Sequence, residues 1–255
     1  MMINDKLIEL PDYGRLIVVT DLHGNFEDYK RYIDLWDKND SDFHIVFTGD
    51  LIHSMEDDDG SIEILDDVID KSKKYPNFHA LLGNHEWAHV VNKDIYKNNE
   101  NLLDDFTNLV SFKKGYVEPS LTNYIKFFKT MPFFVKTANG VFISHAGPSK
   151  EIDSIEKFNT IFDGDYTNPL LDAFLWNRYD RFTDYNQVDV DNFLRVMGLK
   201  YMVVGHNVVE SYKAFGNQVI ISSSFYTNVK TYLDLDLSKP LDSIEDLLKQ
   251  LKFLI

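Results

Sequence analysis

The sequence predicts an α/β fold built on a mixed β-sheet or on two packed sheets. In the first half of the chain, short apolar runs alternate with stretches of helical spacing, a pattern typical of parallel strands joined by helices. In the second half, apolar runs come in pairs around turn dipeptides, which indicates antiparallel hairpins. Many of these runs are nearly continuous in Val, Ile, Leu and Phe, so we expect strands that are buried on both faces.

The first half contains three predicted strands with helices between them. A strand rich in Val and Ile precedes a helix over residues 26–36, and Asn25 is placed to cap that helix. A second strand ends at Thr48, and the helix after it has Ser61 as its expected N-cap. The third strand is predicted from Phe78 to Leu82. This order predicts a largely parallel arrangement.

Residues 94–131 interrupt the alternation of strands and helices. Leu102 and Phe106 begin one helical pattern, and Leu121 and Ile125 begin another. Two inserted amphipathic helices could form a cap over the substrate. They could equally pack on the sheet as covering helices, so both interpretations stay open.

The second half begins with a predicted hairpin that turns at Asn139 and Gly140. A helix near Val190 to Met197 ends at Gly198, and another hairpin follows around residues 216–217. We expect the chain to close with a helix from Ser243 to Leu254. These late hairpins add antiparallel strands, which is why the predicted sheet is mixed.

Length and composition narrow the classes of protein. The chain has 255 residues, 44% of them apolar, and no linker rich in Gly, Pro or Ser, so we expect residues 1–255 to form a single domain. The absence of cysteine excludes disulfides, thiolate metal sites and cysteine nucleophiles. No stretch approaches the ~20 apolar residues of a membrane span, and the N-terminal residues do not read as a signal peptide, so we expect a cytoplasmic protein.

The formal net charge of −15 argues against binding to duplex nucleic acid or to an anionic membrane, because both require a basic surface. It does not exclude a phosphorylated substrate, since two divalent ions would add about four positive charges at one place. The oligomeric state is left open.

Five apolar runs lead to side chains that can bind metal ions. They are LIVVT before Asp21 and the nearby His23, HIVFTG before Asp50, FHALLG before Asn84 and His85, VFIS before His145, and YMVVG before His206. Because ligands bind at the carboxyl ends of strands in open α/β sheets, we expect these side chains to converge on one rim. Two carboxylates, one amide and up to four imidazoles are enough for two metal ions, a set that predicts metal-assisted phosphoester hydrolysis.

The first expected ion takes Asp21 and His23, which lie two residues apart, so that both side chains can point the same way. The carboxylate of Asp50 is the natural bridge, because each of its oxygens can bind one of two ions about 3.5–4 Å apart.

The second expected ion takes Asp50 together with Asn84, His145 and His206. The amide of Asn84 contributes an oxygen without adding negative charge that would repel a phosphate. Nitrogen and oxygen ligands without sulfur suit Mn, Fe, Zn or Ni.

His85 has a different predicted role. Adjacent residues in a turn rarely bind the same ion, so we expect Asn84 to be the ligand and His85 to protonate the leaving oxygen as a general acid. The run from His85 to His89 also matches H-E-x-x-H, the zinc-protease helix motif. We expect a loop at His85 because Gly83 precedes it closely, and we place His89 in a first helical turn near the pocket, which disfavours the protease interpretation.

In this order, the motifs resemble those of the calcineurin-like metallophosphoesterases, most closely the phosphoprotein phosphatase branch. That branch carries DxHG, GDxxDRG, GNHE, HAG with a later LW segment, and GH. The matching text is DLHGN from Asp21, GDLIHS around Asp50, GNHE ending at Glu86, SHAG around His145, LWNR at Leu175 to Arg178, and VVGHN around His206. The resemblance covers roughly residues 15–235. It implies a four-layer αββα sandwich, the ligand sets given above, and His85 as the proton donor.

The second block departs from the family pattern. The Asp that pairs with the catalytic histidine in the family is His53 here, and the Arg that binds substrate phosphate is Ser54. Arg178 and Arg181 are candidates to supply the missing guanidinium, and His53 could itself contact phosphate.

The ligand set and the resemblance together predict a metal-dependent phosphoesterase, most simply a phosphomonoesterase. A hydroxide activated by two metals would attack phosphorus, and His85 would act with Asp50 and Asn84 in catalysis. One alternative is a hydrolase of dinucleoside polyphosphates or other phosphodiesters. Another is a metal-binding regulatory protein with weak turnover, suggested by the changes in the second block. The substrate is expected to be a phosphorylated small molecule, a nucleotide or a phosphoprotein.

Overall fold

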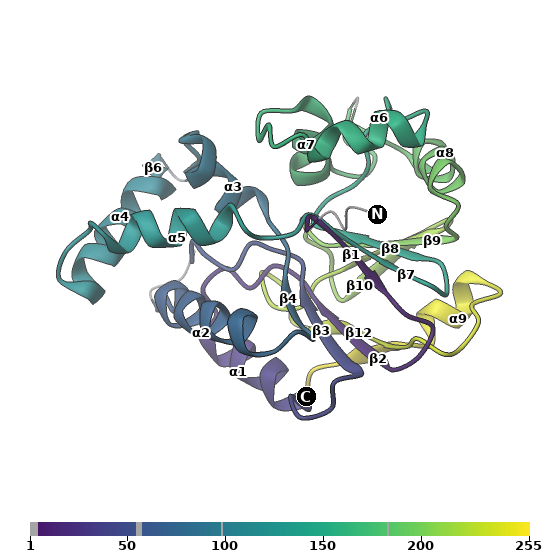
Figure 1. Ribbon diagram of the computed structural model, residues 1–255, viewed down its shortest axis with the longest axis horizontal. Helices are drawn as coiled ribbons and strands as arrows, with labels where there is room; N and C mark the ends of the chain where they lie inside the picture. Colours follow the sequence, from purple (N-terminus) through teal and green to yellow (C-terminus); the bar gives the residue numbers. More distant parts are fainter. Residues whose placement is uncertain (1–4, 55–57, 98, 183) are drawn as a thin grey trace.

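The structure is a computed structural model that describes residues 5–54, 58–97, 99–182 and 184–255 (Figure 1). Two β-sheets pack face to face at its centre. The first sheet has the spatial order β13 (Leu251–Phe253), β12 (Thr231–Asp236), β2 (Arg15–Val19), β3 (Phe43–Phe47) and β4 (Phe78–Ala80). The second has the order β1 (Leu7–Leu10), β7 (Phe134–Thr137), β8 (Val141–Ser144), β9 (Tyr201–Val204), β11 (Gln218–Ile221) and β10 (Tyr212–Phe215).

Helices cover the outer sides of the two sheets, which completes the predicted αββα sandwich (Figure 1). The first sheet is covered by α1 (Phe26–Leu35) and α2 (Ser61–Lys74). The second is covered by α6 (Ile155–Asn159), α7 (Pro169–Trp176) and α8 (Gln187–Met197), and a short 3₁₀ turn, Thr160–Phe162, follows α6.

Both sheets are mixed, as the pattern of the sequence predicts. Strands β2, β3 and β4 run parallel, whereas β12 pairs antiparallel with β2 and with β13. In the second sheet, β7–β8 and β10–β11 are antiparallel, and β8, β9 and β11 are parallel. Val18 and Ile143 lie in the apolar core between the sheets, while Ile17 and Phe142 belong to the core on the helix side. These strands are therefore buried on both faces.

The inserted segment forms two helices, α4 (Leu102–Lys114) and α5 (Ser120–Phe128), preceded by the hairpin of β5 (Tyr96–Lys97) and β6 (Glu100–Asn101). The two helices pack on each other, on α2 and on α3 (Asn84–Val91), and they extend to one side of the sandwich (Figure 1). They therefore pack as covering helices on α2 and α3, while the hairpin and Leu102 at the start of α4 reach the cavity of the site described below. The extent of the domain, residues 1–255, stays a prediction.

Two predictions about local structure are wrong in detail. The N-cap of α2 is Gly60 and not Ser61, which is the first residue of the helix. The hydroxyl of Ser61 instead accepts a hydrogen bond from the backbone N–H of His53, at 3.1 Å. The third strand ends at Ala80 and not at Leu82, because the chain then bends and the N–H of Leu82 donates to the carbonyl of Pro132.

The predicted C-terminal helix is also wrong in extent. Helix α9 covers only Ile244–Leu248, and the chain then forms β13, which pairs antiparallel with β12. The open edge of β12 offers backbone hydrogen bonds that outweigh a helical continuation. Among the described residues, no helix combines the length and apolar character needed to cross a bilayer.

Two imidazoles lie side by side on the parallel part of the first sheet. His44 on β3 and His79 on β4 are stacked, with 3.2 Å between Nδ1 of His44 and Nε2 of His79. Burial, reinforced by His44, lowers the pKa of His79 to about 3. The unfolded chain therefore binds more protons than the folded chain below the ordinary pKa of histidine, and the free energy of unfolding falls as the pH drops toward 3.

We expect His79→Thr to remove much of this loss of stability. Between pH 7 and pH 4.5, the free energy of unfolding of the variant should fall by about 2 kcal/mol less than that of the wild-type protein. Urea denaturation at several pH values measures both slopes. Parallel slopes for the two proteins would contradict the prediction.

Candidate metal centre

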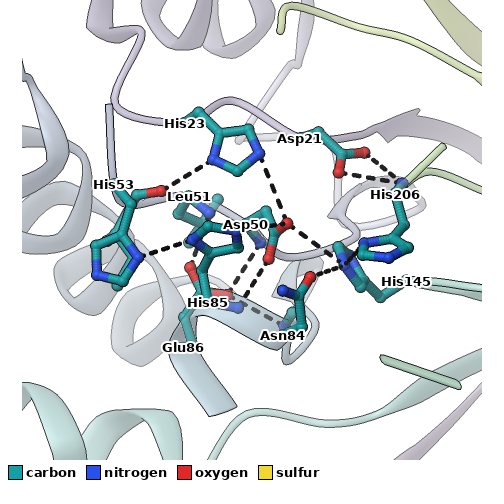
Figure 2. Close-up of polar contacts among 12 residues, drawn as sticks. Asp21, His23, Asp50, Leu51, His53, Asn84, His85, Glu86, His145 and His206 are labelled. Atoms are coloured by element: carbon teal, nitrogen blue, oxygen red, sulfur yellow. Dashed lines mark hydrogen bonds and ion pairs between the residues drawn. The ribbon is translucent and has the colours of Figure 1, made fainter. Parts of the chain in front are cut away.

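The carboxyl ends of four strands and the start of one helix bring the predicted ligands together (Figure 2). Asp21 and His23 follow β2, Asp50 follows β3, Asn84 and His85 begin α3, His145 follows β8, and His206 follows β9. Several have positive φ angles that are uncommon for residues other than glycine: 39° for Asp21, 45° for His23, 52° for Asp50 and 59° for His206. Such strained backbone conformations cluster at functional sites.

At the centre of the site, lone pairs face one another. The ring of His145 donates from Nδ1 to the carbonyl oxygen of Thr48, at 3.0 Å, which in the neutral imidazole leaves Nε2 without a hydrogen. That bare Nε2 lies 2.9 Å from Oδ1 of Asn84 and 3.5 Å from Oδ2 of Asp50. Electron-rich atoms this close repel unless a cation lies among them. The donor set therefore fits a metal ion.

His206 and His23 are held in the same way. Nε2 of His206 donates to the carbonyl of Trp176 at 3.2 Å, which leaves its Nδ1 bare, 3.2 Å from Nε2 of His145. Nδ1 of His23 donates to the carbonyl of Ile52 at 3.2 Å, and its bare Nε2 lies 3.6 Å from Oδ2 of Asp50. A backbone carbonyl on the outer ring nitrogen is the usual way to orient a metal-binding histidine.

Two groups of side chains within the described part of the chain have donor atoms close enough to hold an ion. One is His23, Asp50 and His85, and the other is Asp50, His145 and His206, with the atoms of each group within 4.8 Å of one another. Asp50 belongs to both groups, which is the arrangement expected of a bridging ligand.

The carboxylate of Asp21 lies beside these groups and accepts the backbone N–H of His206, at 2.9 and 3.1 Å. A Cβ atom on Gly205 would come within 2.1 Å of this carboxylate, so the glycine is required for its position.

The protonation states of His23, His206 and Asp50 suit a cation. Burial lowers the pKa of His23 to about 4 and holds the pKa of His206 well below its ordinary value. Burial alone would raise the pKa of Asp50, but the surrounding imidazoles reverse the effect, so its pKa is lowered. Neutral imidazoles and an ionised carboxylate are the forms that bind metal.

His85 differs from the other histidines of the site. Its Nε2 lies 3.8 Å from Oδ2 of Asp50, but its outer Nδ1 meets another imidazole, Nδ1 of His53, at 2.7 Å. Nε2 of His53 in turn lies 2.9 Å from Nε2 of His89. His53 therefore lies behind His85, and it does not line the cavity of about 260 Å³ at the ligands, which we call the metal cavity.

The expectation of a loop at His85 is wrong, because helix α3 begins at Asn84. His85 and His89 lie one turn apart on the same face, and His89 is in the second turn rather than the first. The protease interpretation fails for other reasons. The buried carboxylate of Glu86 accepts the backbone N–H groups of Asp50, Leu51 and Gly83, at 2.9, 2.8 and 3.1 Å. His53 also separates the two histidines of the motif.

The metal cavity opens above the ligands. Arg178 lines it and donates from Nη1 to the carbonyl of His206, at 2.7 Å. Arg181 is exposed and does not line it.

Sequence reasoning missed three further residues that line this cavity, Tyr96, Lys97 and Phe225. The ammonium group of Lys97 lies 4.8 Å from the ring centroid of Phe225. Lys97 comes from the inserted hairpin, and no motif in the sequence marks it.

The comparisons with known proteins agree with this geometry. A family model described as calcineurin-like phosphoesterase matches residues 14–210. The chain belongs to this family. It is therefore a hydrolase of phosphoric esters, and the family's centre of two divalent metal ions fits the donor set described above. No curated protein matches the chain in sequence.

Solved structures share the fold of this phosphoesterase. A protein serine/threonine phosphatase from Saccharomyces cerevisiae, with similarity to human phosphatase PP5, has 17% identity and a TM-score of 0.73, with 97% of this chain and 82% of that chain covered. A cold-active protein-tyrosine phosphatase from a Shewanella species has 16% identity and a TM-score of 0.67, with 98% and 84% covered. At these identities the similarity concerns the fold alone.

The loop that carries Asp50 and the N-cap of α3, just before Asn84, touch backbone to backbone through Gly49 and Gly83. Gly49 has a φ of +101°, and a Cβ atom there would lie 2.3 Å from the backbone nitrogen of Gly83. We expect Gly49→Ala to lower the free energy of unfolding by about 1–3 kcal/mol more than Gly164→Ala does. Gly164 also has a positive φ, +84°, but apart from its chain neighbours no atom of the described residues lies within 4 Å of its Cβ position. Chemical denaturation measures both variants, and equal losses would show that the two loops can separate freely.

Proposed function

We propose that this phosphoesterase hydrolyses phosphomonoesters with two divalent metal ions. The observation that carries the proposal is the group of ring nitrogens and side-chain oxygens around Asp50 that face one another without a hydrogen between them. These atoms repel one another unless cations lie among them, at the carboxyl ends of the strands. His23 and Asp50, with Asp21 from the lining of the same cavity, would hold one ion. The ligands of the other would be Asp50, Asn84, His145 and His206. When bound, the ions supply Lewis-acid polarisation of a phosphoryl oxygen and a lowered pKa for the attacking water.

His85 is the proposed general acid. Its Nε2 faces the cavity beside Asp50. Its outer nitrogen contacts the imidazole of His53 and not a backbone carbonyl, so this contact does not require the ring hydrogen to lie on the outer nitrogen. An N–H at that position can protonate the oxygen that leaves phosphorus.

Arg178 is the proposed phosphate-binding residue. It lines the cavity, whereas Arg181 is exposed and His53 lies behind His85. Arg178 would replace the guanidinium that the family pattern has at the position of Ser54. Lys97 offers a second cation in the lining of the same cavity.

The charge around the site favours a monoester over a dinucleoside polyphosphate. A second cavity of about 600 Å³ shares His23 and Phe225 with the metal cavity. Five acidic residues and three basic ones line it: Glu27, Asp28, Asp58, Asp59 and Glu63, with Arg31, Lys113 and Lys230. This excess of acidic groups disfavours a substrate with further phosphates there. A phosphopeptide or a phosphorylated metabolite without additional anionic groups fits better.

A screen of phosphorylated metabolites, nucleotides and phosphopeptides with the Mn²⁺-loaded protein tests the proposal. We expect release of inorganic phosphate from monoesters and little hydrolysis of dinucleoside polyphosphates. Membership of the phosphoesterase family favours an enzyme over the regulatory metal-binding protein considered above. Two bound ions without hydrolysis of even an activated aryl phosphate would reverse that preference.

The general-acid role predicts a dependence on the leaving group. His85→Asn should lower kcat on an alkyl phosphate by about 10²–10³-fold, because an alkoxide needs a proton to leave. On p-nitrophenyl phosphate the loss should be far smaller, since the nitrophenolate leaves without protonation. Steady-state kinetics on both substrates, with metal content checked, measure the ratio. Equal losses on the two substrates would remove His85 from this role.

Arg178 should act mainly through phosphate affinity. We expect Arg178→Gln to raise KM and the inhibition constant of inorganic phosphate about tenfold, since a charged hydrogen bond to phosphate is lost. Arg181→Gln is the matched control and should change neither constant. If the Arg181 variant shows the larger effect, the assignment of the guanidinium is wrong.

A further inference from the structure

The histidines of the metal centre differ in what binds their outer ring nitrogen. In His23, His145 and His206, that nitrogen donates to a backbone carbonyl. A carbonyl can only accept a hydrogen bond, so it fixes a ring that is bare on the metal side. In His85, the outer nitrogen meets His53, which can donate as well as accept. The carbonyl contact that fixes the tautomer of the other three histidines therefore does not fix the tautomer of His85.

His85, His53 and His89 form a continuous row, which we call the imidazole row. Nδ1 of His85 lies 2.7 Å from Nδ1 of His53, and Nε2 of His53 lies 2.9 Å from Nε2 of His89. All three side chains are buried. Each contact requires one donor and one acceptor, because two N–H groups or two bare nitrogens cannot face each other at these distances.

The inserted helices cover this row. The ring of Phe106 on α4 lies 5.7 Å from that of His53 and 4.9 Å from that of His89. The ring of Phe128 on α5 lies 6.1 Å from that of His89. Aromatic rings offer no competing hydrogen-bond acceptor of comparable strength, so the row keeps its own contacts. The insertion thus covers His53 and His89, the part of the row that lies behind His85.

A row of neutral imidazoles can hold its hydrogens in two directions. In the first, Nε2–H of His89 donates to His53, Nδ1–H of His53 donates to His85, and the remaining hydrogen of His85 lies on Nε2, toward the cavity. In the second, every hydrogen is reversed, and Nε2 of His85 is bare.

Asp50 favours the first direction. Its Oδ2 has three imidazole nitrogens nearby, those of His145 at 3.5 Å, His23 at 3.6 Å and His85 at 3.8 Å. The hydrogens of His145 and His23 are already committed to backbone carbonyls. Of these three rings, His85 is the one that can direct a hydrogen toward the carboxylate.

We propose that His53 and His89 are positioning residues, which hold His85 as the Nε2–H tautomer with its hydrogen in the metal cavity. The inference deepens the proposed function, because it rests on His85 as the proton donor to the leaving group. The second direction would instead leave His85 as a further metal ligand. The tautomers of three rings therefore decide between a donor and a ligand.

Long-range ¹H–¹⁵N correlation spectra of histidine-labelled protein, metal-free and loaded with diamagnetic Zn²⁺, report each tautomer directly. We expect the Nε2–H form for His85 and His89 and the Nδ1–H form for His53. Reversed tautomers would overturn the inference. This measurement does not depend on turnover, so it decides the inference even if no phosphomonoester proves to be a substrate. The absence of any phosphomonoester substrate would count against the proposed function alone.

Kinetics of His89 variants provide a second test, because His89 lies outside the metal cavity. His89→Gln can keep an N–H near the position of Nε2, whereas His89→Leu is of similar size and has no donor. With the leucine variant, kcat on an alkyl phosphate should fall about tenfold, a part of the general-acid effect, while p-nitrophenyl phosphate hydrolysis and metal content stay within about twofold. The glutamine variant should recover most of the loss.

His44→Asn, which alters the imidazole pair on the first sheet, is the matched control and should leave the ratio of the two rates unchanged. If His89→Leu lowers both rates equally, or if His89→Gln is as impaired as His89→Leu, His89 has only a structural role and the positioning assignment is wrong.

Discussion

The arrangement of the site depends on one constraint: a backbone carbonyl that accepts a hydrogen bond from the outer nitrogen of an imidazole. Thr48, Ile52 and Trp176 provide these carbonyls from segments that follow β3 or end α7. Each turns a bare nitrogen toward the carboxylate of Asp50, and the resulting concentration of lone pairs is unfavourable without cations. The positive φ angles of the ligand loops are consistent with this demand, since the strained turns bring the side chains together.

Much of the fold could be predicted because the relevant signals are local. Continuous apolar runs identify doubly buried strands, and Asn25 and Gly198 mark helix ends by the chemistry of their own side chains or backbone. The failures lie where distant partners decide. The last residues form a strand because β12 leaves an edge to pair with, which no local pattern reveals. Ser61 cannot be told from a cap by sequence, since its hydroxyl is used by the backbone of His53.

The site divides in the same way. Apart from His85, which lies at the start of α3, the side chains of the two candidate metal groups follow strands, so the rule that strand ends converge was enough to predict that they meet. Lys97 was missed because it lies in the inserted hairpin, and no pattern in the sequence indicates that this hairpin folds against the cavity. The motif from His85 to His89 lies on helix α3, although the sequence predicted a loop at His85. Its meaning nevertheless comes from His53, more than thirty residues away, which stands between the two histidines.

The replacement of the family's Asp by His53 also changes the charge of the site. A carboxylate there would add a negative charge near Asp50, within a chain whose formal net charge is already −15. Burial and the neighbouring imidazoles hold the pKa of His53 well below its ordinary value, and burial lowers that of His89 to about 4, so both are neutral at pH 7. A neutral row can orient His85 without weakening the attraction of the metal cavity for phosphate. Orientation of the donor and attraction of the anion are thereby supplied by separate groups, the imidazole row on one side and the cations on the other.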